Sequence, residues 1–282
     1  MAHPSSTTLP AGSLTYGRTV ADFISQFIGI DLQKPYLEAH IEVLNGSRKD
    51  YPSNGLNFAS AGSGVLQATN QDLGVTSLQE HLQQFQTLVE QNYIDKNRIQ
   101  NSIFFFESGS NDIFDYFLTF SPPTLDPDAY CSNLAPLGCG LGGVLLSGAP
   151  IDRCYGKMNA MVKKYNKGLE SLVNQMPVNY PDVTVYGALY DIVHQFRATP
   201  TRYRLHDLSS ACCGKGTLGG LLQCGKEGYT ICSWPNKFLL WDFFHPSEHA
   251  YKIISKALWA GTKYRIRPLN LKTLVNITLP RV

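Results

Sequence analysis

Asp242 and His245 are the residues of this chain whose types and spacing point most directly to catalysis. An aspartate three residues before a histidine suits one turn or a tight loop, where its carboxylate can bond one imidazole nitrogen and hold the tautomer. The other nitrogen is then free to take a proton from a serine hydroxyl. The pair therefore predicts two members of a catalytic triad, and the serine must be sought elsewhere.

Two further segments place polar groups where strands are expected to end. Residues 56–61 have the character of a strand that runs into a turn containing Gly62 and Gly64. Residues 103–106 are continuously apolar, as in a buried parallel strand, and they lead into Asn111. Open α/β folds bind ligands at the carboxyl edge of the sheet, so we expect both segments to lie there.

The remaining pattern predicts helices that alternate with strands. Apolar residues recur at helical spacing in four segments: 20–30, 77–93, 154–176 and 247–264. Residues 183–189 alternate as a strand, and residues 205–228 form a loop rich in glycine and cysteine. This order predicts an α/β fold with a mainly parallel sheet and helices on both faces. Without a repeat, heptad run or linker, we expect a single domain over residues 1–282.

Composition excludes several classes of protein. A content of 43% hydrophobic and 16% charged residues is ordinary for a globular chain. The net charge is +2 and no Lys/Arg stripe is visible, so nucleic acid is not an expected partner. No apolar run reaches the length of a membrane span. Residues 1–12 lack the charged start and apolar core of a signal peptide, which taken alone favours a cytosolic protein.

Cysteines and glycosylation sequons point instead to a secreted protein. Four of the seven cysteines fall within residues 212–232. Zinc is one interpretation, but adjacent Cys212 and Cys213 do not match CxxC spacing, and a disulfide-stapled loop suits the pattern better. The odd count leaves one thiol without a partner in this chain. Sequons begin at Asn45 and Asn276. A metal site is not expected, because no third ligand accompanies the histidines near residue 245.

Several segments, in order, resemble the plant GDSL esterase/lipase family of the SGNH hydrolase superfamily. They are Gly17–Ile24, Asn57–Gly64, Gly109-Ser110-Asn111-Asp112 and Asp242–His245, with further likeness at Cys154–Asn159 and Ala211–Gly214. The resemblance covers nearly the whole chain. It implies a three-layer α/β/α flavodoxin-like fold, secretion, and hydrolysis of lipid or secondary-metabolite esters, or acyl transfer, by Ser-His-Asp chemistry. It implies no cofactor, a small-molecule ester as the partner, and a monomer.

The resemblance also suggests a role for each candidate residue. His245 would act as general base and then general acid, and Asp242 would orient it. The Asn111 amide and a backbone N–H at Gly62 or Gly64 would stabilise the oxyanion of the tetrahedral intermediate. Structural roles are also open, because Asn111 and the residue after it can cap a helix, and the glycines can serve plain turns.

The chain departs from the family in two places. The Gly-Asp-Ser block that ends the first strand and supplies the nucleophile is not found, and Ser5, Ser6 and Ser13 are interpreted as loop serines. Residues 131–134 alone occupy a place where the family has a helix and a strand, which need roughly twenty to thirty residues. We therefore expect an incomplete sheet that lacks its first strand and one further central strand, with exposed apolar faces on their neighbours.

Two hypotheses of function follow. The first is an ester hydrolase or acyltransferase whose serine is supplied by an upstream segment of the complete gene product. The second is an inactive homologue that binds an ester or acyl ligand, or a non-functional remnant. Exon skipping, a truncated gene model and a decayed gene copy explain the losses equally well. For the chain as written we expect little or no turnover that depends on His245.

Overall fold

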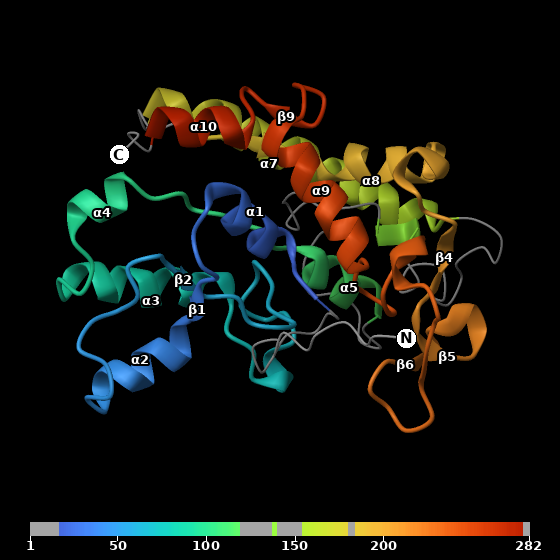
Figure 1. Ribbon diagram of the computed structural model, residues 1–282, viewed down its shortest axis with the longest axis horizontal. Helices are drawn as coiled ribbons and strands as arrows, with labels where there is room; N and C mark the ends of the chain where they lie inside the picture. The colour runs from blue at the N-terminus through green and yellow to red at the C-terminus, as the bar shows by residue number, and fades with distance from the viewer. Residues whose placement is uncertain (1–16, 119–136, 140–153, 180–183, 279–282) are drawn as a thin grey trace.

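Helices and short strands alternate along the described part of the chain. The computed structural model describes residues 17–118, 137–139, 154–179 and 184–278 (Figure 1). The α-helices are α1 (Val20–Ile28), α2 (Tyr36–Leu44), α3 (Leu78–Glu90), α4 (Lys96–Gln100), α5 (Ser110–Leu118), α7 (Gly156–Asn179), α8 (Leu189–Ala198), α9 (Glu248–Ala260) and α10 (Leu271–Thr278). The strands are β1 (Lys34–Pro35), β2 (Leu56–Asn57), β3 (Tyr186–Gly187), β4 (Asp207–Ala211), β5 (Cys213–Lys215), β6 (Leu222–Gln223), β7 (Thr230–Ile231), β8 (Phe238–Leu240) and β9 (Ile266–Arg267). The predicted α/β class is confirmed.

The strands pair in small groups. Two pairs are parallel, β1 with β2 and β4 with β8. β3 pairs with β9 in the antiparallel sense, and β5 lies between β6 and β7 in an antiparallel sheet of three strands. Within the described ranges, the parallel sheet is thus represented by two short pairs, and the second of these leads directly into the residues around Asp242.

The buried strand expected at residues 103–106 is not formed, and that prediction is wrong. Phe104, Phe105 and Phe106 are 46%, 46% and 61% exposed, and none of them belongs to a strand or bridge. A parallel strand becomes buried only when neighbours pair with its backbone on both sides and helices cover it. A continuous apolar run therefore indicates that a segment favours burial, but it does not show whether the neighbouring strands and helices that would bury it are present.

The predicted helices are confirmed within a few residues at their ends. α1, α3, α7 and α9 fall inside the four segments with helical spacing or extend one of them slightly. At the start of α3, the Glu80 backbone N–H donates to Ser77 Oγ at 3.3 Å, and the Ser77 N–H donates to the Glu80 carboxylate at 2.7 Å. This reciprocal capping box satisfies two backbone donors that the first turn would otherwise leave unpaired. The strand expected at 183–189 is shorter, since only Tyr186–Gly187 is extended before α8 begins.

The main core lies where α8, α9 and β8 meet. Ile192, Phe196 and Ile254 are 0–2% exposed there, on the faces that the helices turn towards one another. α1 packs against α9, with the rings of Phe27 and Trp259 5.6 Å apart. In Figure 1, α7, α8, α9 and α10 run along the upper side, while α2, α3, β1 and β2 lie at the lower left. Within the described ranges, no helix is long and apolar enough to cross a membrane.

Disulfides hold the glycine- and cysteine-rich loop, as predicted. Cys212 bonds Cys232, and Cys213 bonds Cys224, so both bonds close the small sheet built on β5. A third disulfide joins Cys139 to Cys154 just before α7. The seventh cysteine, Cys131, lies outside the described residues.

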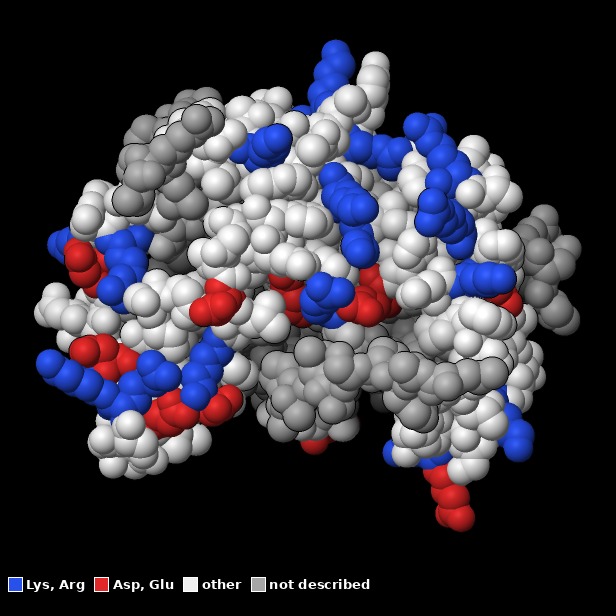
Figure 2. Space-filling model, viewed as in Figure 1, with Lys and Arg blue, Asp and Glu red and all other residues white. Residues whose placement is uncertain are grey.

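Charged side chains are spread over the surface. On the face drawn in Figure 2, lysine and arginine occur in separate groups, with acidic groups beside them at the left and in the centre of the view. This distribution fits the net charge of +2. It offers no continuous basic track on this face of the kind that follows a phosphate backbone.

Candidate active site

The Asp242–His245 pair has the geometry that its spacing predicts. Both carboxylate oxygens of Asp242 lie 3.0 Å from Nδ1 of His245. Oδ1 also accepts the backbone N–H of Phe244 at 2.9 Å and that of His245 at 2.7 Å. These backbone bonds hold the carboxylate in place inside the loop, so Nδ1 carries the proton shared with Asp242 and Nε2 is left as the basic nitrogen.

Backbone bonds close the base of the loop that carries the pair. The Trp241 N–H donates to the His245 carbonyl at 2.8 Å, and the Ser247 N–H donates to the Leu239 carbonyl at 2.9 Å. Ser247 also caps α9, because its hydroxyl accepts the Ala250 N–H at 3.2 Å. The end of β8 and the start of α9 thus hold the seven residues between them, including Asp242 and His245.

The pair lies at the edge of the protein interior. The side chain of Asp242 is 13% exposed and that of His245 is 29% exposed. Partial burial strengthens the interaction of the carboxylate with the imidazole, while the outer part of the ring stays accessible to a ligand. Among the described residues, no hydroxyl group bonds to Nε2 of His245.

The segment that leads into Asn111 lies beside this pair. The ring of Phe114, on α5, meets the ring of Phe244 edge to face at a centroid distance of 5.4 Å. Desolvation raises the pKa of the Glu107 carboxyl, and the nearby His245 imidazole lowers it by a smaller amount. By its surface area, Glu107 as a whole residue is exposed. The same carboxylate and that of Asp242 add to burial in raising the pKa of Tyr251.

Asn111 and the glycine turn are joined by a hydrogen bond. Asn111 Nδ2 donates to the Ser63 carbonyl at 2.8 Å. This contact uses one amide hydrogen and orients the group, so the second hydrogen is directed by the same bond. The structure therefore brings together two segments that are 48 residues apart in the sequence.

Glycine is required at positions 62 and 64 of the turn for different physical reasons. Gly62 adopts a left-handed conformation with φ of 82°, which side-chain-bearing residues rarely take. Gly64 is required by packing, because a Cβ there would lie 2.5 Å from Asp112 Oδ1 and 2.7 Å from Thr69 Cβ. Gly64 is thus needed for the approach of a carboxylate, which sequence reasoning did not predict.

The other candidate residues lie apart from this region or outside the described residues. Asn45 follows the last turn of α2 and Asn276 lies within α10, and both are exposed. Ser5, Ser6 and Ser13 lie outside the described residues. Among the residues that are described, no group of three His, Cys, Asp or Glu side chains is arranged to hold a metal ion.

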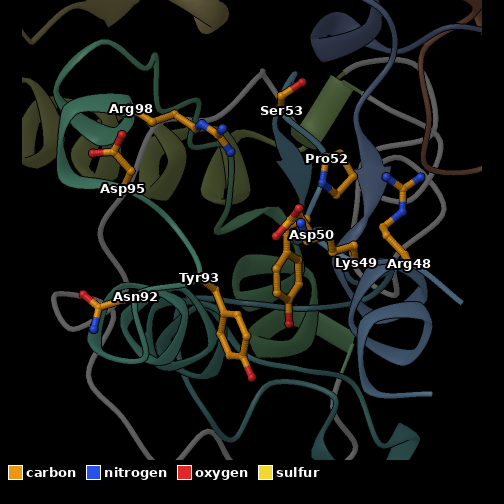
Figure 3. A pocket seen from close by; sticks show the side chains of 10 residues that line it. Arg48, Lys49, Asp50, Pro52, Ser53, Asn92, Tyr93, Asp95 and Arg98 are labelled. Atoms are coloured by element: carbon orange, nitrogen blue, oxygen red, sulfur yellow. The ribbon is translucent and has the colours of Figure 1, made fainter. Parts of the chain in front are cut away.

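Two surface hollows of the described part lie elsewhere. One, of about 560 Å³, lies between residues 48–53 and residues 92–98. Figure 3 shows Arg98 reaching across its upper side, while Asp95 and Asn92 point away at the left. A second, of about 520 Å³, is lined by residues next to β9. Neither hollow includes Asp242 or His245.

Near the site, sequence reasoning gave Glu107 no role and considered Asp112 only as a helix cap. Both residues lie directly beside features that the sequence analysis discusses. Glu107 follows the apolar run at 103–106, and Asp112 follows Asn111. Their positions directly beside these segments were the usable signal in the sequence.

Comparison with known proteins agrees with the order of these segments. A sequence model of the family described as GDSL-like Lipase/Acylhydrolase matches residues 5–258. GDSL esterase/lipase 6 from Arabidopsis thaliana is 54% identical over 290 residues, which cover 94% of this chain and 80% of that protein. GDSL esterase/lipase 7 from the same plant is 28% identical over 307 residues, which cover 95% of this chain and 82% of that protein.

Proposed function

Because this chain belongs to the GDSL-like lipase/acylhydrolase family, we propose that its Asp242–His245 pair is the base of a carboxylic ester hydrolase. The bond from His245 Nδ1 to the two carboxylate oxygens of Asp242 carries the proposal. It fixes the tautomer in which Nε2 can accept a proton. The family makes ester hydrolysis the general reaction class, and the roles of individual residues are our proposal.

The steps follow from the positions of these groups. Nε2 of His245 takes the proton of a serine hydroxyl as its oxygen attacks the ester carbonyl. The resulting oxyanion receives hydrogen bonds from the Asn111 amide and from a backbone N–H at Gly62 or Gly64. His245 then gives the proton to the leaving alcohol, and water repeats the sequence on the acyl-enzyme.

The serine nucleophile has no candidate among the described residues. We propose that it comes from the Gly-Asp-Ser block of a longer gene product. The alignment with GDSL esterase/lipase 7 extends over 307 residues, more than the 282 residues of this chain, so it contains positions that have no counterpart here. Because this excess lies within the aligned region, it supports the proposal that the chain lacks an internal segment that this relative contains.

The finer aspects of the proposal concern substrate and location. We propose that the substrates are lipid or secondary-metabolite esters, and that the protein is a secreted monomer involved in lipid degradation. The three disulfides support an oxidising compartment. Because one family model spans residues 5–258, the match also supports a single domain.

A serine-directed fluorophosphonate probe tests the proposed function. We expect it to label the product of the full-length transcript and to leave the 282-residue chain unlabelled, because only an activated serine reacts. A full-length reading frame without a Gly-Asp-Ser block, or a full-length product that stays unlabelled and inactive on p-nitrophenyl acetate, would show that the proposal is wrong. The alternative of a non-catalytic homologue is favoured by the lack of a nucleophile among the described residues. It would be refuted by labelling.

Asn45 is the sequon that we expect to carry a glycan. It lies in an exposed turn, where its Oδ1 accepts the Ser47 N–H at 2.9 Å and also bonds the Ser47 hydroxyl. Exposure and a turn make this side chain accessible, whereas Asn276 lies within helix α10. After secretion from a eukaryotic host, Asn45→Gln should remove the mass that N-glycosidase releases from the wild type.

Asn276→Gln is the matched control for this experiment. We expect its glycan mass to equal that of the wild type. The interpretation of the turn fails if Asn45→Gln keeps the full mass while Asn276→Gln loses it.

A further inference from the structure

Asp112 is a buried carboxylate that the mechanism above does not use. It is 1% exposed and lies in the first turn of α5. Oδ1 accepts the Leu66 N–H at 2.8 Å and the Thr69 hydroxyl at 2.8 Å, and Oδ2 accepts the Val65 N–H at 3.0 Å. In the described part of the chain, no lysine, arginine or histidine forms an ion pair with it. Its charge is therefore stabilised by donors from one short segment.

These donors all belong to the segment that follows the glycine turn. Because both carboxylate oxygens are used, the segment is held at two points and cannot rotate about either one alone. Asn111, the preceding residue on α5, bonds the Ser63 carbonyl at 2.8 Å. Two adjacent side chains of one helical turn thus hold the backbone on both sides of Gly64.

Gly64 shows how closely the carboxylate fits the turn. A Cβ at this position would lie 2.5 Å from Asp112 Oδ1, so the glycine backbone rests against the carboxylate. The Gly64 carbonyl in turn accepts the Leu78 N–H at 3.0 Å. The orientation of the peptide groups around Gly64 is therefore fixed by two contacts, one with the Asp112 carboxylate and one with the first residue of α3.

The contacts also decide which backbone donors remain for the reaction. The N–H groups of Val65 and Leu66 are used by Asp112, so they cannot reach an oxyanion. The Ser63 N–H donates to the Ser60 carbonyl at 3.1 Å. Donors for the oxyanion must then come from Asn111 and from the backbone at Gly62 and Gly64.

We propose that Asp112 is the positioning residue of the oxyanion-binding turn, holding residues 62–66 so that the backbone N–H groups of Gly62 and Gly64 and the Asn111 amide converge on one point. This inference rests on the proposed ester hydrolase function, since it concerns the same site. A carboxylate is needed because an amide would turn one of its two acceptors into a donor facing a backbone N–H. Asp112 touches no reacting atom and acts through the turn.

Asp112→Asn tests the proposal in two measurements. In the 282-residue chain, we expect amide hydrogen exchange to become at least about 10-fold faster at the one of Val65 and Leu66 whose N–H then faces the amide NH2 group, since that bond is lost. In the full-length product, we expect kcat for p-nitrophenyl acetate to fall about 100-fold, because a displacement near 1 Å costs this much, while KM changes little. Asp115→Asn, a partly exposed carboxylate on the same helix, is the control that should leave both unchanged.

A milder variant covers the case in which Asp112→Asn does not fold. Thr69→Val removes only the hydroxyl donor and keeps the size of the side chain, and we expect it to lower kcat by a smaller factor, about 3- to 10-fold. Unchanged exchange at Val65 and Leu66 overturns the inference even if activity falls. Unchanged kcat in an active full-length product overturns the inference alone, whereas an inactive full-length wild type overturns the proposed function as well.

Discussion

His245→Ala is expected to lower kcat/KM of the full-length product for p-nitrophenyl acetate by about 10⁴-fold, and Asp242→Asn by a similar factor. The first change removes the base that takes the serine proton. The second leaves Nδ1 facing an amide whose donor group favours the wrong imidazole tautomer, so Nε2 is protonated and no longer basic. Both effects appear in kcat rather than KM, because ground-state binding does not require proton transfer.

His194→Ala provides the control for these two variants. This histidine lies on α8 with its side chain exposed, and we expect its replacement to leave turnover unchanged. The outcome that contradicts the assignment is a full-length His245→Ala variant that retains most of its activity. In the 282-residue chain, we expect His245→Ala to leave the rate of p-nitrophenyl acetate hydrolysis unchanged, because residual hydrolysis without the serine does not depend on His245.

Removal of the Cys212–Cys232 disulfide has the second largest expected effect. Replacing both cysteines by alanine releases a 20-residue loop, which should cost about 3 kcal/mol of the free energy of unfolding. The loop also supports the site, since the Cys212 N–H donates to the Leu240 carbonyl at 3.2 Å and the Cys213 N–H to the Trp241 carbonyl at 2.6 Å. These contacts hold the two residues before Asp242, so we expect activity to fall together with stability.

Removal of the Cys139–Cys154 disulfide is the control that separates the loss of stability from the loss of activity. Its sequence separation of 15 residues is similar, so its removal should also cost about 3 kcal/mol. It lies at the start of α7 and makes no described contact with the loop that carries Asp242. Urea denaturation measures the loss of stability in each variant. Ester hydrolysis, at a temperature where both variants are folded, measures the loss of activity that is not due to unfolding. Equal activity in the two variants would show that the β5 sheet does not position the dyad.

Local spacing allowed the base pair and the helix starts to be predicted. The contact between Asp242 and His245 spans three residues, and the capping box of Ser77 and Glu80 spans three as well. Both depend on backbone turns that the intervening residues can form by themselves. The same holds for α1 and α9, where the apolar spacing indicates a helix before any partner is known.

Contacts between distant segments were not predictable in this way. Asp112 accepts donors more than 40 residues away, and the reason for Gly64 follows only from that approach. The apolar run at 103–106 misled for the same reason, because its burial depends on strands contributed by other parts of a chain. Hydrophobic pattern records a preference for burial, while the neighbours that satisfy it are a property of the whole fold.

The amino-acid sequence by itself determined the family, the orientation of His245 by Asp242, and the positions of the main helices, since these depend on residue types at short separations. Only the tertiary structure decided that Asn111 and Asp112 form hydrogen bonds with the glycine turn and the residues after it. It also decided that the disulfide-closed sheet contacts the two residues before Asp242, and that Phe104–Phe106 are exposed. Each of these depends on bringing segments tens of residues apart into contact, and such contacts are selected by the packing of the entire chain rather than by any local pattern.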